Sequence, residues 1–103
     1  MKVGGAPAVR IFGSGETFQA GMLTSLLNVL LSNSFPIDTL CGGRAECGRC
    51  LIRIRSGAEF LSPRREKEER KLASLGSGKD MRLACQCYTR GNIEIEVIHR
   101  RDG

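Results

Sequence analysis

The chain has 103 residues, enough for one domain with a small core and too few for a large substrate cleft. Its hydrophobic fraction of 41% is that of an ordinary globular protein, and no apolar run approaches the roughly 20 residues that span a bilayer. The formal net charge of +5 fits either a solvated basic surface or an acidic partner. No aromatic-studded basic sheet or recognition-helix pattern is visible, so we expect no nucleic-acid partner.

The N-terminal segment, residues 1–8, lacks the hydrophobic stretch of a secretory signal peptide, so we expect a cytoplasmic protein without membrane insertion. Thiols stay reduced in the cytoplasm. The five cysteines therefore favour metal or redox chemistry over a disulfide framework. We expect a monomer with a single domain over residues 1–103, in which residues 1–7 form a loosely ordered extension.

The first predicted elements are two strands and a helix. Residues 8–12 alternate and are rich in β-branched side chains, residues 13–15 (Gly-Ser-Gly) predict a turn, and residues 16–20 predict the return strand of a hairpin. An apolar stripe with helical spacing follows. It consists of Met22, Leu23, Leu26, Leu27, Leu30 and Leu31. We expect this stripe to pack into the core.

A strand and a second helix are predicted in the middle of the chain. Residues 51–55 alternate as a strand that ends at Ser56-Gly57. Ser62 as N-cap and Pro63 at the first helical position predict a helix over residues 63–75 that stops at Gly76. Its many charges are typical of a solvated face with pairs four residues apart, such as Glu66–Arg70.

The last predicted strand is residues 92–97, a regular alternation that follows Gly91. The order of elements is strand, strand, helix, loop, strand, short helix, strand. This order predicts a small α+β domain with a mixed sheet and one long helix packed across it.

Four cysteines form the most informative pattern. Cys41, Cys47 and Cys50 are separated by five and by two residues, and Cys85 follows in Arg82-Leu-Ala-Cys85-Gln86. Thiolates are soft ligands, and four of them suit Zn²⁺ or an iron–sulfur cluster. Structural zinc sites more often contain two C-x₂-C pairs, and here only Cys47 and Cys50 have that spacing. Buried or catalytic thiols are the third alternative.

Glycines in the same segment favour the cluster. Gly42, Gly43 and Gly48 allow the main chain to wrap closely and to adopt positive φ angles. A cluster with bridging sulfides carries negative charge and therefore needs backbone N–H groups directed at it. The residues alone thus favour an iron–sulfur cluster while leaving zinc as an alternative.

Three segments resemble motifs of the [2Fe–2S] ferredoxins of the plant and adrenodoxin superfamily. They are Pro36-Ile-Asp-Thr-Leu-Cys-Gly-Gly43, Cys47-Gly-Arg-Cys50 and Arg82-Leu-Ala-Cys-Gln86. The resemblance covers nearly the whole chain. The five-residue spacing after Cys41 is more similar to the adrenodoxin-like and bacterial branch than to the plant branch, which has four.

The resemblance implies a β-grasp (ubiquitin-like) ferredoxin fold with a cluster-binding loop near one end of the mixed sheet. It implies that Cys41, Cys47, Cys50 and Cys85 hold a [2Fe–2S] cluster. It also implies that residues 51–55 lie beside residues 92–97. One face of this pair would contain Ile52, Ile54, Ile93, Ile95 and Val97, and the other would contain Arg53, Arg55, Glu94 and Glu96.

Two departures from the family pattern concern the partners. Leu51 stands where adrenodoxin-like members usually have His after the third cysteine. The helix over residues 63–75, usually acidic in that branch, has mixed charge here, and the whole chain is basic. These departures put the usual partners in question and leave the cluster unaffected.

Cys87 competes with Cys85 for the fourth ligand position. If Cys85 begins an extended segment, both side chains point the same way and alternation does not separate them. The family places its ligand directly after Arg-Leu-(small residue), which is Cys85, so we expect Cys87 to be a small buried residue. We expect the lone histidine, His99, at the surface, and a Rieske-type site would need two histidines.

The sequence contains no nucleophile–base pair and no Walker-type phosphate loop, so we expect an electron carrier and not an enzyme. The prediction is a one-electron carrier between a reductase and an acceptor enzyme. At least one partner would have an acidic surface that contacts Arg44 and Arg49, with Arg64 and Arg65 as further candidates. An iron–sulfur redox sensor or regulatory module, or a Cys₄ zinc-stabilised interaction domain, is the alternative.

Overall fold

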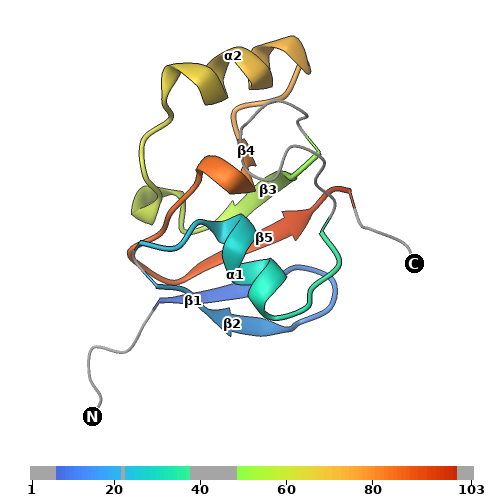
Figure 1. Cartoon of the computed structure of the whole chain (residues 1–103), viewed down its shortest axis with the longest axis vertical. Coiled ribbons are helices and arrows are strands. Elements are labelled where there is room, and N and C mark those ends of the chain that lie inside the picture. The colour runs from blue at the N-terminus through green and yellow to red at the C-terminus, as the bar shows by residue number, and fades with distance from the viewer. Residues whose placement is uncertain (1–6, 22, 38–48, 100–103) are drawn as a thin grey trace.

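The computed structural model describes residues 7–21, 23–37 and 49–99 (Figure 1). Within these residues five strands form one mixed sheet in the order β2-β1-β5-β3-β4, with β1 and β5 parallel and the other neighbours antiparallel. The strands are β1 (Ala8–Ile11), β2 (Thr17–Gln19), β3 (Leu51–Ser56), β4 (Met81–Leu83) and β5 (Ile93–Val97). This arrangement is the expected α+β β-grasp fold.

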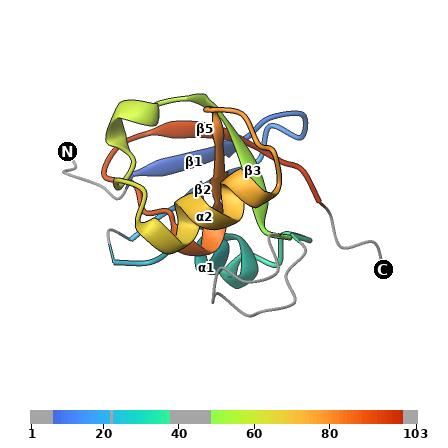
Figure 2. The same ribbon diagram turned by 90° about the horizontal axis from the view of Figure 1, so that it is seen from above.

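Two α-helices and two 3₁₀ turns complete the described structure. Helix α1 (Leu26–Ser32) lies across one face of the sheet, and α2 (Glu66–Ser74) lies beyond the sheet beside β4 (Figures 1 and 2). The turn η1 (Ala58–Phe60) follows β3, and η2 (Ala84–Gln86) follows β4 directly. The predicted long helix is therefore present across the sheet, but α1 has only seven residues.

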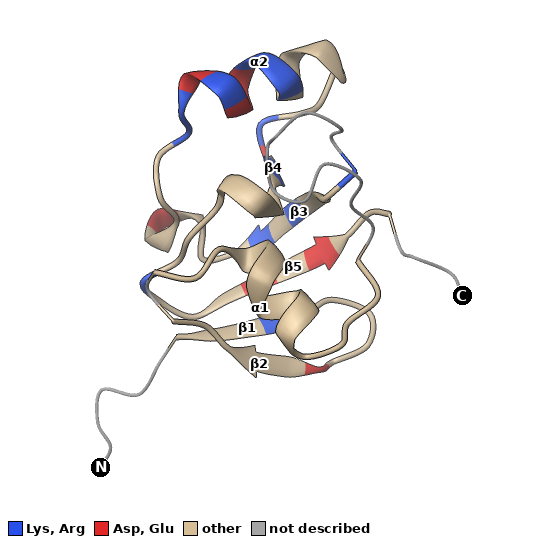
Figure 3. Ribbon diagram, in the orientation of Figure 1, with Lys and Arg blue, Asp and Glu red and all other residues tan. Residues whose placement is uncertain are grey.

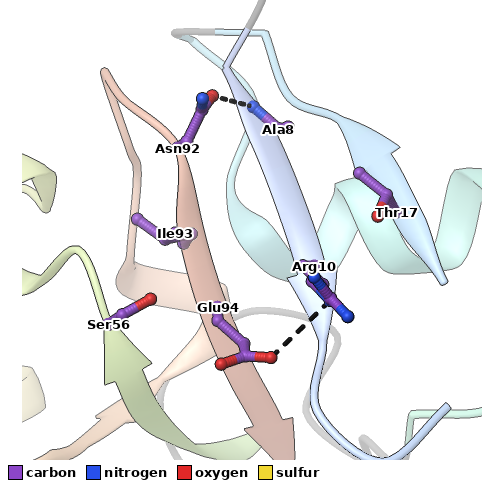
Figure 4. A pocket seen from close by; sticks show the side chains of 7 residues that line it. All are labelled: Ala8, Arg10, Thr17, Ser56, Asn92, Ile93 and Glu94. Carbon is purple, nitrogen blue, oxygen red and sulfur yellow. Dashed lines mark hydrogen bonds and ion pairs between the residues drawn. The ribbon is translucent and has the colours of Figure 1, made fainter. Parts of the chain in front are cut away.

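The first and last strands are joined side by side, as the close view of a shallow pocket between them shows (Figure 4). The Ala8 N–H donates to Asn92 Oδ1 over 2.9 Å, and Arg10 Nε lies 3.7 Å from Glu94 Oε2. The predicted hairpin turn before β2 is also present, with positive φ angles of 99° at Gly13 and 74° at Gly15. Strands from the N-terminal and C-terminal parts of the chain are thus neighbours within one sheet.

The predicted pairing of β3 with β5 is confirmed. Ile52 lies opposite Val97, and Arg53 lies opposite Glu96. On the outer face, Arg53 Nη1 and Arg55 Nη1 lie 3.5 and 3.6 Å from Glu96 Oε1. The inner face contributes to a core whose largest fully buried apolar side chains include Ile11, Leu26, Leu30, Ile37, Ile52, Leu83 and Ile95.

Helix α1 begins at Leu26, later than the apolar stripe starting at Met22 had predicted. Ser25 is its N-cap, and the Ser25 Oγ accepts a hydrogen bond from the Asn28 N–H over 3.2 Å. Leu23 therefore precedes the helix and is 95% exposed, although it belongs to the stripe. Val29, outside the stripe, is buried instead. Met22 lies outside the described residues.

Helix α2 begins at Glu66, so the prediction that Ser62 caps it and Pro63 starts it is wrong. Ser62 pairs with Tyr88 instead: its N–H donates to the Tyr88 carbonyl over 2.8 Å, and its Oγ accepts from the Tyr88 N–H over 3.1 Å. The predicted end is correct. Gly76 has a φ of +65° and its N–H donates to the Ala73 carbonyl, as in a Schellman C-cap.

Strand β4 was not predicted from the sequence. All three of its residues are buried, so the segment lacks the alternation that marks a half-exposed strand. The predicted loose extension, residues 1–7, lies outside the described residues except for Pro7, whose carbonyl accepts from the Ala20 N–H. Among the described helices, none has the length and apolar character required to cross a bilayer.

We expect Gly57→Ala to destabilise the protein by about 2–4 kcal/mol, because the left-handed φ of +85° is unfavourable for alanine and the new Cβ would lie 2.6 Å from the Asn92 carbonyl oxygen. Gly15→Ala is the matched control. Its φ is +74°, but the added Cβ meets no atom within 4 Å, so the cost should be about 1–2 kcal/mol. Urea unfolding of both variants measures the difference, and equal losses would contradict the close packing at Gly57.

Candidate metal centre

The predicted ligands divide between described and undescribed segments. Cys41 and Cys47 lie outside the described residues, as do Gly42, Gly43 and Gly48. Cys50 and Cys85 are buried, with exposures of 0% and 6%. No group of three His, Cys, Asp or Glu side chains suited to a metal occurs within the described ranges, which contain only two of the four predicted ligands.

The pairing of β3 with β4 brings Cys50 and Cys85 to one end of the sheet. Leu51 lies opposite Leu83, and the Ala84 N–H donates to the Cys50 carbonyl over 3.0 Å. Cys50 immediately precedes β3, and Cys85 lies in η2, immediately after β4. Two soft donors from distant parts of the sequence are therefore neighbours at a buried position. This donor chemistry fits an iron–sulfur cluster, with the predicted loop of residues 41–50 ending at the same place.

Cys87 occupies a different environment from Cys85. Cys85 lies inside the 3₁₀ turn η2 and Cys87 is the residue after it, so the alternation of an extended strand does not apply. Cys87 is fully buried, and its carbonyl accepts a hydrogen bond from the Leu26 N–H at the start of α1 over 2.8 Å. Burial raises the pKa of the Cys87 thiol to about 12, which keeps the thiol neutral at physiological pH. These features support the role of a small core residue.

A buried ion pair that the sequence did not predict lies beside this site. Arg82 Nε donates to Glu68 Oε2 over 2.7 Å, and Arg82 Nη2 donates to Glu68 Oε1 over 3.0 Å. Glu68 is fully buried, and Arg82 is 6% exposed. Burial alone would lower the pKa of Arg82, but the hydrogen bond to Glu68 and nearby negative charge shift it upward, so the guanidinium stays cationic.

The same pair organises the backbone around Cys85. Glu68 Oε2 also accepts from the Leu83 N–H over 3.0 Å, and Arg82 Nη1 donates to the Ser62 carbonyl over 2.9 Å. The pair thus connects α2, β4 and the segment before α2. Its Arg82 lies three residues before Cys85 in the sequence. One sequence signal pointed to Glu68: it lies four residues before Leu72, the buried apolar residue of α2, and so shares its helix face.

Basic and acidic residues are mixed along α2 at this end of the molecule (Figure 3), and the nearby arginines have different partners. Arg64 Nη2 donates to the carbonyls of Lys79 and Met81 over 2.7 and 2.8 Å, so its guanidinium is used within the fold. Arg70 forms the predicted pair with Glu66, at 3.1 Å. Arg49 and Arg65 are exposed. Arg44 lies outside the described residues, and His99 is exposed, as predicted.

Comparison with known proteins gives one family and several relatives. Residues 9–90 match the family model described as "2Fe-2S iron-sulfur cluster binding domain". One subunit of the Na(+)-translocating NADH-quinone reductase of Haemophilus influenzae is 33% identical over 81 residues, which cover 79% of this chain and 18% of that protein. The chain therefore spans less than a fifth of the length of this relative.

Solved structures share the fold. An ISC-like [2Fe–2S] ferredoxin from Pseudomonas putida superposes with a TM-score of 0.80 at 24% identity, covering 94% of this chain and 96% of that one. The ferredoxin reductase of carbazole 1,9a-dioxygenase superposes with a TM-score of 0.70 at 23% identity, covering 91% of this chain and 26% of the reductase. The same architecture thus occurs both as a chain of this size and within a longer reductase.

We expect Glu68→Ala to cost about 3–5 kcal/mol of unfolding free energy, because it leaves the Arg82 guanidinium buried without its partner. Glu66→Ala on the same helix removes an exposed pair with Arg70 and should cost less than about 1 kcal/mol. Urea unfolding followed by circular dichroism compares the two variants. Similar small losses would mean that the buried pair contributes little to stability.

Proposed function

The chain belongs to the family of 2Fe-2S iron-sulfur cluster binding domains, and we propose that it passes single electrons between a reductase and an acceptor enzyme. Membership confirms the predicted [2Fe–2S] cofactor and the resemblance to ferredoxins, and it argues against the zinc alternative. When bound, the cluster supplies a centre that gains or loses one electron. The family points to an electron carrier and not to a catalyst.

The proposed ligands are Cys41, Cys47, Cys50 and Cys85. The observation that supports this set best is the juxtaposition of Cys50 and Cys85 at the ends of β3 and β4, joined by the Ala84 N–H to Cys50 carbonyl hydrogen bond. Burial of both cysteines would keep water from the sulfur atoms. Gln86 Nε2 lies 3.7 Å from Cys85 Sγ, within reach of a weak hydrogen bond that would stabilise negative charge on this sulfur.

We propose that at least one redox partner has an acidic docking surface. The formal charge of +5, counted with neutral cysteines, stays positive when a cluster of charge about −2 is bound. Arg44 and Arg49 belong to the proposed cluster loop and are the main candidates for this contact. Arg64 is a weaker candidate than its sequence position implied, because its Nη2 already donates to two backbone carbonyls. A cytoplasmic, monomeric carrier remains our expectation.

Reductases among the relatives support a reductase as one partner. In the NADH-quinone reductase subunit and the carbazole dioxygenase reductase, the matching segment is a minor part of a longer protein.

The purified protein should be red-brown and contain two irons and two inorganic sulfides per chain, as the [2Fe–2S] family requires. Chemical reduction should produce the electron paramagnetic resonance signal of one unpaired electron shared by two irons. Iron, sulfide and zinc analysis of protein produced with ample iron provides the measurement. Stoichiometric zinc in place of iron would refute the proposed function.

Cysteine substitutions test the ligand set. Cys85→Ser should remove or strongly weaken the visible absorption of the cluster and lower stability, because metal binding and folding are coupled. Cys87→Ser is the matched control two residues away, and it should keep the absorption, since Cys87 lies in the core against α1. Retention of the cluster in Cys85→Ser together with its loss in Cys87→Ser would reverse the assignment.

A further inference from the structure

A cavity of about 250 Å³ opens between the segment before α2 and the segment after η2. Its lining residues are Ser62, Pro63, Arg65, Gln86 and Tyr88. Two hydrogen bonds between Ser62 and Tyr88 join its walls, and the Ser62 carbonyl accepts from the buried Arg82. The Glu68–Arg82 ion pair, which joins β4 to α2, therefore also positions one wall of the pocket through Ser62.

The pocket extends to the residue next to a proposed cluster ligand. Gln86 lines it and follows Cys85 in η2, with its Nε2 3.7 Å from Cys85 Sγ. Cys85 itself is 6% exposed. A group of another protein bound in the pocket would thus be separated from Cys85 by the Gln86 side chain alone. Electron transfer slows steeply with distance, so a contact at this place would shorten the path to the cluster.

The pocket has a positively charged lining residue, Arg65, that is not engaged in an ion pair within the described residues. Arg65 is exposed, and no described residue forms a hydrogen bond or ion pair with its guanidinium. The neighbouring arginines differ, because Arg64 donates to backbone carbonyls and Arg70 pairs with Glu66. None of the described lining residues is acidic. A carboxylate is the complementary group, since arginine binds it with two parallel hydrogen bonds.

We propose that this pocket is a docking point for a redox partner, with an Asp or Glu carboxylate of the partner bound to Arg65 beside Gln86. The inference rests on the proposed electron-transfer function and adds a location to it. It assigns adjacent residues to different tasks: Arg64 holds the chain inside the fold, and Arg65 faces the partner.

Oxidation by small cobalt complexes tests the location without a known partner. The reduced holoprotein gives one electron to cobalt(III), which becomes cobalt(II), while the protein returns to its oxidised form. The anionic complex cobalt(III)–EDTA presents carboxylates, and hexaamminecobalt(III) is a cationic comparison. For Arg65→Glu we expect the rate with the anionic complex to fall roughly tenfold at low salt and the rate with the cationic complex to rise.

Arg70→Glu is the matched control. It makes the same charge change in α2, on a side chain that is 75% exposed and does not line the pocket. Its effect on both rates should be far smaller, and added salt should reduce the difference between the variants. Equal effects of Arg65→Glu and Arg70→Glu would show that only net charge matters, and would overturn the docking point.

Tyr88 provides a readout independent of electron transfer. It is the only tyrosine, and the chain has no tryptophan, so tyrosine emission reports on the pocket. Arg65→Glu should weaken quenching of this emission by iodide and strengthen quenching by caesium, and Arg70→Glu should change neither. Unchanged quenching in Arg65→Glu would also overturn the proposal. A wild-type protein without cluster absorption would instead refute the function on which the proposal rests.

Discussion

The ion pair between Glu68 and Arg82 is the contact on which the end of the molecule that contains Cys50 and Cys85 depends. It is bidentate and buried, and each partner also makes one hydrogen bond to the backbone, at Leu83 and Ser62. Two segments that are distant in the sequence, residues 62–68 and 82–83, meet there. The position of Cys85, three residues after Arg82, follows from the position of β4, which this pair holds against α2.

Such a pair is costly to bury, and its geometry explains how the cost is offset. Taking a carboxylate and a guanidinium out of water is unfavourable, and their attraction compensates only when the remaining donors and acceptors are satisfied. Here Glu68 accepts three hydrogen bonds and Arg82 donates three. A hydrophobic contact could stabilise the packing equally well, but it would not specify the register of β4 against α2. We therefore regard the pair as a device for positioning.

The other charged side chains are more exposed and contribute less to the stability of the fold. On the outer face of the sheet, Arg53 and Arg55 share Glu96 at distances of 3.5 Å and more, with arginine side chains about 40% exposed, so each pair contributes little stability. Arg65 is exposed, at the pocket that Gln86 also lines. The basic side chains thus differ in their use: Arg53 and Arg55 pair with Glu96 on the outer face, and Arg65 forms no ion pair within the described residues.

Features that depend on near neighbours could be predicted from local patterns of residues. The spacing of Cys41, Cys47 and Cys50 indicated the cofactor, and the alternation in residues 51–55 and 92–97 identified β3 and β5. Gly76 marked the end of α2, because a left-handed φ is a local requirement.

Tertiary structure alone decided the features that depend on distant segments. Ser62 has the composition of a helix cap, yet pairing with Tyr88 takes its hydrogen bonds and α2 begins later. Strand β4 has no periodicity because it is buried on both faces, and Glu68 looked like part of a solvated charged face until Arg82 was placed against it. The physical reason is the same in each case. Contacts between segments far apart in the chain outweigh the local preference of either segment, and local patterns contain no record of those partners.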